Sequence, residues 1–146
     1  RRVLFRSGCI DGMKGDSVSD IDMCECKQTK KNFISIKVAW LKKIVDESMG
    51  LCPFVHIRFV RGKQAGGDDV DWWVVPVSFF NDMNLVPTQS VSISGKSKVF
   101  NISLFNDIDG DDLPIVETIW SKMEKRDTWW ILPQQFFVAL LNQMEA

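Results

Sequence analysis

Glu25 and Lys27 stand two positions apart in the segment CECKQT, which reads as part of a buried β-strand and follows an acidic turn. Side chains alternate between the two faces of a strand, so Glu25 and Lys27 are expected on the same face. Opposite charges placed in this way form either a structural ion pair or two members of a metal-dependent catalytic site. Cys24 and Cys26 would lie on the opposite face and pack there as small hydrophobic residues.

The elements that must position these residues alternate between strands and helices. We expect strands over residues 20–28, 53–60 and 71–76, and a helix over residues 36–49 between the first two. A strand, a helix and a second strand in this order imply a crossover connection and a partly parallel sheet. Residues 1–7 are a further short strand candidate. The sequence therefore predicts an α/β fold.

The expected helix has one broad apolar face. Gly50 is a plausible end for it, and Pro53 lies just beyond. Lysines project from its other side, at positions 37, 42 and 43. The apolar face consists of Ile36, Trp40, Leu41, Ile44, Val45 and Met49.

Two segments of the second half resemble each other. DWWVVPVSFF at 71–80 and TWWILPQQFF at 128–137 each predict a strand that ends at a proline, followed by a helix whose aromatic pair packs back on the sheet. Between them we expect a β-hairpin that turns at Ser94 and Gly95, and then a short helix over residues 114–124.

Length and composition are those of a folded domain. A chain of 146 residues with 45% hydrophobic content can bury a core, and it fits a single domain over 1–146. The catalytic core would span about 1–80, and 81–146 would add strands and a C-terminal helix. No apolar run is long enough to cross a membrane and no secretory signal is visible, so we expect a cytoplasmic protein with reduced thiols.

Charge is unevenly distributed along the chain. Residues 1–63 carry 13 Lys and Arg against 7 Asp and Glu, a balance of +6, whereas residues 64–146 carry 5 against 12, a balance of −7. A basic face beside an acidic pocket suits a polyanionic substrate reached through a divalent metal. The acidic second half is a poor candidate for the main nucleic-acid surface.

The first part of the chain resembles the PD-(D/E)XK nuclease superfamily, and within it the phage and archaeal Holliday junction resolvase-like endonucleases. The resemblance runs from about residue 7 to residue 59. Its elements are Ser7-Gly8, KGD at 14–16, ECKQT at 25–29 and the ISIKVAWLKKIVDES that follows. In this family an aspartate precedes a β-hairpin whose second strand carries Glu-x-Lys. Asp16, Glu25 and Lys27 match those places, and the implied fold is a restriction-endonuclease-like mixed sheet flanked by helices.

The resemblance implies a role for each matching residue. Asp16, Glu25 and the backbone carbonyl of Cys26 would bind Mg²⁺, which Mn²⁺ can replace, and Asp20 is an alternative to Asp16 because the link to Glu25 is short. Lys27 would orient or deprotonate the attacking water, and Gln28 would position the phosphate or the water. The expected DNA contacts are Arg6, Ser7, Lys14, Lys30 and Lys31.

The implied activity is the hydrolysis of phosphodiester bonds in branched DNA such as a four-way junction. Alternatives are another nuclease of the superfamily with a restriction-like, repair or nicking role, or an inactive DNA-binding or scaffold protein on the same fold. Two symmetric cuts require two active sites, so we expect a homodimer or a higher homo-oligomer. The two Trp pairs also favour a partner, since alternation sends one Trp of each pair to either face of the sheet.

Overall fold

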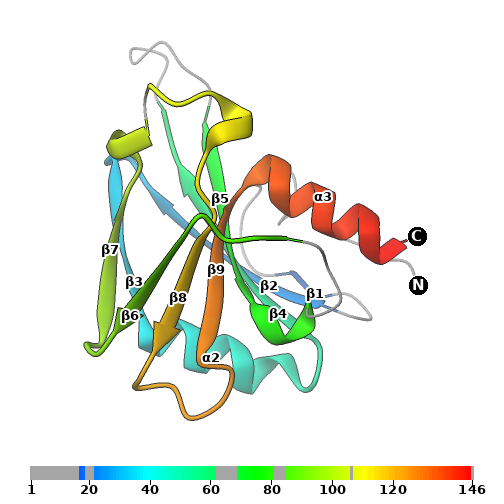
Figure 1. Ribbon diagram of the computed structural model, residues 1–146. Helices are drawn as coiled ribbons and strands as arrows, with labels where there is room; N and C mark the ends of the chain where they lie inside the picture. The colour runs from blue at the N-terminus through cyan, green and yellow to red at the C-terminus, as the bar shows by residue number, and fades with distance from the viewer. Residues whose placement is uncertain (1–16, 19–21, 62–68, 81–84, 106, 146) are drawn as a thin grey trace.

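A mixed β-sheet forms the centre of the chain in this computed structural model, with α3 on one side of it and α2 on the other (Figure 1). The structure describes residues 17–18, 22–61, 69–80, 85–105 and 107–145. Within these ranges the strand order of the main sheet is β1-β2-β4-β5-β9-β8-β6, and β3 pairs with β7 in a separate two-stranded sheet. The strands are β1 (Ser17–Val18), β2 (Asp22–Thr29), β3 (Phe33–Lys37), β4 (Cys52–Phe59), β5 (Val70–Pro76), β6 (Gln89–Ile93), β7 (Ser97–Asn101), β8 (Val116–Trp120) and β9 (Thr128–Pro133). The helices are α2 (Val38–Ser48) and α3 (Gln134–Glu145), with 3-10 turns η2 (Val77–Phe79), η3 (Ile102–Phe105) and η4 (Gly110–Asp112).

The predicted strand–helix–strand unit is confirmed by β2, α2 and β4. β2 and β4 are parallel neighbours with Cys26 opposite His56, and α2 packs against both. The helix begins at Val38 rather than at residue 36. Residues 33–37 form β3 instead, since their β-prone sequence pairs antiparallel with β7 and buries Ile36.

α2 ends just before Gly50, as predicted, but one residue of the predicted apolar face is exposed. Met49 adopts the left-handed conformation with φ of 51°, and Gly50 follows with φ of 88°. This turn carries the Met49 side chain away from the helix face, so it is 90% exposed and the prediction that it packs inward was wrong. Leu41 and Ile44 are buried as expected.

The two WW-x-x-Pro-x-x-FF segments contain neighbouring central strands, β5 and β9. Each strand ends at its proline, and a helical segment follows, as predicted. Trp72 and Trp129 belong to the core on the side of α2, whereas Trp73 and Trp130 belong to the core on the side of α3. Aromatic rings from distant elements complete both faces: the ring of Trp72 lies 4.7 Å from that of Phe100, and Trp73 stacks on Phe137 at 4.0 Å.

Two predictions for residues 89–124 were wrong. β6 and β7 do not form a hairpin, since β6 pairs with β8 in parallel and β7 pairs with β3, so residues 94–96 connect two different sheets. The helix expected over residues 114–124 is replaced by β8, in which Val116, Thr118 and Trp120 face inward at strand spacing. β-branched side chains and a neighbouring β9 edge favour the strand at this place.

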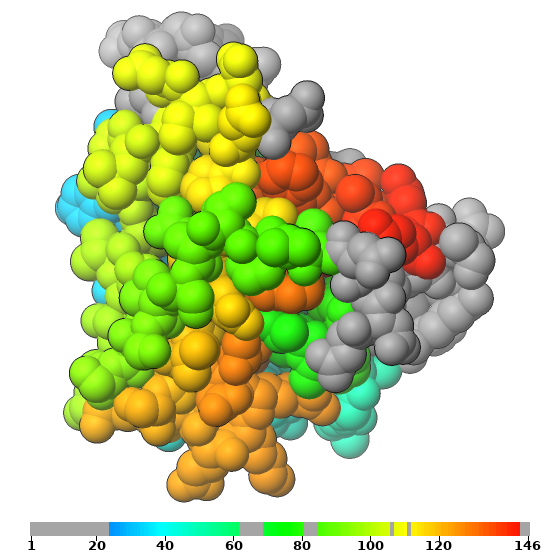
Figure 2. Space-filling model, in the orientation of Figure 1, coloured from blue at the N-terminus to red at the C-terminus, as the bar shows by residue number. Residues whose placement is uncertain are grey.

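The second half of the chain covers most of the face seen in the space-filling view (Figure 2). Its five tryptophans, Trp72, Trp73, Trp120, Trp129 and Trp130, are each at most 5% exposed within this one chain. The expectation that the Trp pairs need a partner subunit to cover them was therefore wrong, because segments of 97–105 and α3 supply the cover.

Candidate functional site

Glu25 and Lys27 project from the same face of β2, as their spacing predicts. Lys27 Nζ lies 3.0 Å from Glu25 Oε1, and Lys43 Nζ, from α2, lies 3.8 Å from the same oxygen. The Glu25 residue is only 6% exposed, whereas 29% of the Lys27 side chain remains accessible. The carboxylate is thus buried, whereas the side chain of Lys27 is partly accessible to solvent.

The second oxygen of this carboxylate is in an unusual position. Glu25 Oε2 is buried, and it has no hydrogen-bond partner among the residues that the structure describes. A buried carboxylate oxygen left without a donor is costly, and such groups are normally satisfied by a protein donor, a water molecule or a cation. Glu25 therefore has one oxygen held by lysines and one buried oxygen without a partner among the described residues.

A hollow of about 370 Å³ lies beside Lys27. Lys27 Nζ is 5.0 Å from the centre of the Trp40 ring, Lys37 Nζ is 5.9 Å from it, and Lys31 Nζ lies 5.4 Å from the ring of Phe33. These ammonium groups rest on aromatic faces and keep their charge toward solvent. The hollow is lined by Lys27, Gln28, Thr29, Lys31, Phe33, Ile34, Ser35, Lys37 and Trp40, with no acidic residue among them.

The other predicted site residues divide into two groups. Gln28 and Lys31 line the hollow, and Lys30 is exposed in the turn after β2. Arg6, Ser7, Lys14, Asp16 and Asp20 lie outside the described residues, so their predicted roles stay predictions. Within the described ranges, no group of three His, Cys, Asp or Glu side chains is arranged to hold a metal ion. A metal bound by Glu25 would therefore need a further ligand from elsewhere, such as the aspartates of the preceding segment.

The opposite face of β2 carries a buried polar network. His56 Nε2 lies 2.7 Å from Asp71 Oδ1, and His56 Nδ1 lies 3.6 Å from Cys26 Sγ. An ionised carboxylate can only accept, so Nε2 donates to Asp71, and the other ring nitrogen faces the Cys26 sulfur. Arg58 Nε also donates to Asp71 Oδ1 at 2.9 Å. This network links β2, β4 and β5 behind the site.

The charges of this network reinforce one another. Burial alone would raise the pKa of Asp71, but hydrogen bonds from His56 and Arg58 outweigh it and hold that pKa below its usual value. The hydrogen bond that Arg58 donates to Asp71 raises the pKa of Arg58, although burial alone would lower it. Cys24, on the same face, is disulfide-bonded, so the expectation of reduced thiols was wrong for Cys24, while Cys26 and Cys52 remain thiols.

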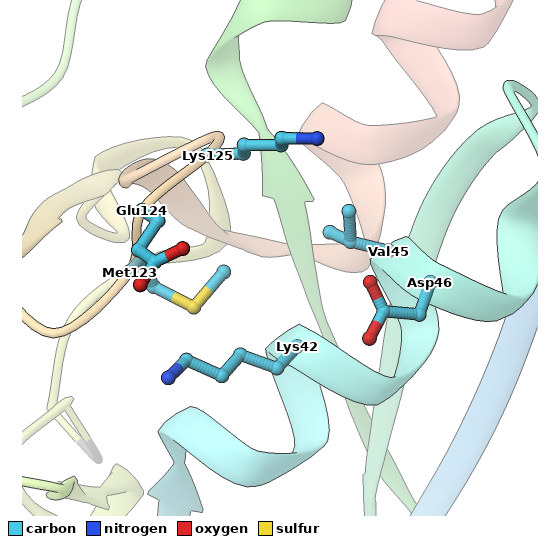
Figure 3. A pocket seen from close by; sticks show the side chains of 6 residues that line it. All are labelled: Lys42, Val45, Asp46, Met123, Glu124 and Lys125. Atoms are coloured by element: carbon cyan, nitrogen blue, oxygen red, sulfur yellow. The ribbon is translucent and has the colours of Figure 1, made fainter.

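A separate hollow of about 260 Å³ lies between α2 and the loop from β8 to β9 (Figure 3). Lys42 and Asp46 face it from α2, and Glu124 and Lys125 face it from the loop. Its two lysines are balanced by two carboxylates. This mixed lining distinguishes it from the hollow beside Lys27.

Sequence reasoning missed the contributions of α2 to the site. Lys43 was placed on the solvent side of the helix, yet its amine reaches Glu25, and Trp40 was assigned to packing although its ring also supports Lys27. The three-residue spacing of Trp40 and Lys43 puts both on one side of the helix, which is a signal that could have identified them together.

Comparison of the chain with models of protein families, with curated proteins and with solved structures found no match. No helix among the described residues is long and apolar enough to cross a membrane.

Proposed function

We propose that the protein is a metal-dependent endonuclease that hydrolyses phosphodiester bonds in DNA, with the PD-(D/E)XK fold and a preference for branched DNA such as a four-way junction. The observation that carries this proposal is the environment of Glu25. Its carboxylate is buried next to Lys27, and its Oε2 has no hydrogen-bond partner among the described residues. A carboxylate oxygen kept free beside an ammonium group is what a divalent cation and an attacking water would require.

The order of the elements supports the proposal. β1 is antiparallel to β2, and Asp16 directly precedes β1 in the sequence, so Glu-x-Lys lies on the second strand of a short hairpin. β2 then leads through α2 to the parallel strand β4. The family resemblance implies this placement of the aspartate, the hairpin and the Glu-x-Lys strand. The hairpin is short, with only two residues in β1, which agrees with the small separation of Asp16 and Glu25.

The residues present fit a hard divalent cation such as Mg²⁺ or Mn²⁺. Glu25 Oε2 and the backbone carbonyl of Cys26 would be ligands, together with the carboxylate of Asp16 or, alternatively, Asp20. When bound, the cation would polarise the scissile phosphate and lower the pKa of a coordinated water. Lys27 would orient that water and offset negative charge in the transition state, and Gln28 would position the phosphate at the edge of the hollow.

The proposal is tested by cleavage of a labelled four-way junction and of a linear duplex of the same sequence, in Mg²⁺. We expect Glu25→Gln and Lys27→Ala each to lower the cleavage rate by at least about a hundredfold, because each removes a group that acts on the transition state. DNA affinity should change by less than about threefold, because it depends mainly on other basic contacts to phosphates. Glu47→Gln is the matched control: Glu47 is an exposed carboxylate that also contacts Lys43, and its variant should cleave normally.

Three outcomes would contradict parts of this proposal. Binding of the junction without any metal-dependent cleavage by the wild type would support an inactive DNA-binding or scaffold protein. Equal cleavage of the junction and the linear duplex would support a nuclease with a restriction-like, repair or nicking role. Parallel loss of cleavage and of thermal stability in Glu25→Gln would indicate a structural ion pair.

A further inference from the structure

A second hollow, of about 480 Å³, adjoins the one beside Lys27 and shares Lys37 with it. It lies next to the start of α2. Two of its lysines come from the acidic second half of the chain: Lys96 follows β6, and Lys122 follows β8. The hollow is lined by Lys37, Val38, Ala39, Lys42, Lys96, Ser97 and Lys122, again with no acidic residue.

The tertiary structure therefore concentrates positive charge that the sequence spreads over about a hundred positions. The two hollows together contain six lysines, Lys27, Lys31, Lys37, Lys42, Lys96 and Lys122. Among the described residues only Lys27 of these six has a carboxylate within 4.0 Å. Bringing like charges together raises the free energy of the folded state, and an anionic ligand relieves that repulsion.

Neighbouring surfaces of the same elements are neutralised, which makes the lysine-lined hollows distinct. Lys43 is paired with Glu25 and Glu47, and the hollow in Figure 3 contains the carboxylates of Asp46 and Glu124. Lys42 lines both that hollow and the lysine-lined one, and marks the border between them. The first turn of α2 contains no acidic residue, so the partial positive charge of the helix start adds to the field.

We propose that the two adjoining hollows form one track for the phosphodiester backbone of a nucleic acid, running from Lys31 past Lys37 to Lys96 and Lys122. Lys27, at the edge of this track, is paired with Glu25 and is not one of its phosphate contacts. Lysine provides a flexible point charge suited to successive phosphates, and phosphate contacts carry no sequence information, so we expect binding that is independent of sequence. Because Lys27 places one end of the track beside Glu25, the role of the track rests on the proposed function, whereas its ligand class does not.

The track is tested by fluorescence anisotropy with a labelled random-sequence duplex over a range of salt concentrations. The key variant is Lys96→Gln/Lys122→Gln, which removes two charges that are not paired with Glu25. Each lost phosphate contact reduces the slope of log affinity against log salt by about 0.9, so the double variant should lower the slope by about 2 and the affinity at 0.1 M salt by about tenfold or more. The control is Lys125→Gln, on the same loop as Lys122, which should leave both the salt slope and the affinity unchanged.

The outcomes separate this inference from the proposed function. An unchanged salt slope in Lys96→Gln/Lys122→Gln, with normal circular dichroism, would overturn the track even if the wild type cleaves DNA. Loss of affinity in that variant together with absence of metal-dependent cleavage in the wild type would retain the track and remove the nuclease. Binding to vesicles containing phosphatidylserine but not to the duplex would overturn the track as a nucleic-acid site.

Discussion

The environment of single residues decides what Glu25 and Lys27 can do. The same two side chains on an exposed strand would form a solvated ion pair worth at most about 1 kcal/mol. Here Glu25 is 6% exposed and retains a buried oxygen without a described partner, while Lys43 provides a second positive charge at 3.8 Å. Burying a carboxylate oxygen without a partner raises the free energy of the folded state. This cost is a reason to expect a ligand at Glu25.

Asp71 is expected to make folding stability depend on pH. The folded-state pKa of Asp71 lies below the ordinary value of 3.8, so its contribution is present above that value and is lost as pH falls through the lower folded-state pKa. We predict that Asp71→Asn lowers the free energy of unfolding at pH 7 by about 1–3 kcal/mol, because His56 and Arg58 lose a charged acceptor. Urea unfolding from pH 7 to pH 2.5 should show the wild type and the variant converging below about pH 4.

Asp46→Asn is the control for this measurement, since Asp46 is an exposed carboxylate on α2. Its unfolding curve should follow that of the wild type at each pH. A constant difference between wild type and Asp71→Asn across the whole pH range would show that the ionised form of Asp71 is not what stabilises the fold.

At the scale of elements, the connection from α2 to β4 depends on an unusual backbone conformation. Gly50 has φ of 88°, and a Cβ atom built there would meet nothing within 4 Å. We predict that Gly50→Ala lowers the free energy of unfolding by about 1 kcal/mol through backbone strain alone. Gly95→Ala is the matched control, because Gly95 has no positive φ and its nearest atom would be 4.0 Å away, so its effect should be near zero.

Chemical denaturation of the two variants measures the difference directly. Equal unfolding midpoints for Gly50→Ala and Gly95→Ala would mean that the turn after α2 relaxes without cost. In that case the position of α2, and with it Lys43 near Glu25, would not depend on this glycine.

At the scale of the whole molecule, the prediction of a homodimer now rests on the proposed function. The tryptophan pairs no longer support it, because they are covered within the chain. On the outer side of α3, Val138 is 37% exposed, and we propose this side as the contact. Since two symmetric cuts in a four-way junction need two active sites, we predict a dimer, and light scattering at micromolar concentration should give twice the 16.7 kDa of one chain.

Val138→Glu should convert such a dimer to a monomer without unfolding it, because the substitution places a charge on the exposed side of α3. A wild-type mass of 16.7 kDa would contradict the dimer and weaken the preference for junctions. It would leave the prediction for Glu25 and Lys27 unaffected.

Local patterns determined much of the first half of the chain and the two central strands. Alternation placed Glu25 and Lys27 on one face, the strand–helix–strand order gave the parallel pair β2 and β4, and the prolines ended β5 and β9. These features depend on the period of side chains and on backbone restrictions of proline, which act within a few residues. Asp16 and Asp20 lie outside the described residues, so their predicted roles remain predictions.

Only the tertiary structure decided the pairings between distant segments. The β-prone residues 89–93, 97–101 and 116–120 each needed a partner strand, and nothing local specifies whether that partner is the next strand or one far along the chain. The same long-range packing buried the tryptophans, brought Lys43 to Glu25 and joined Lys96 and Lys122 to the lysines of the first half. The burial of a side chain and the electrostatic potential at a site depend on residues that are distant in sequence but close in space. For this reason neither could be predicted from local patterns.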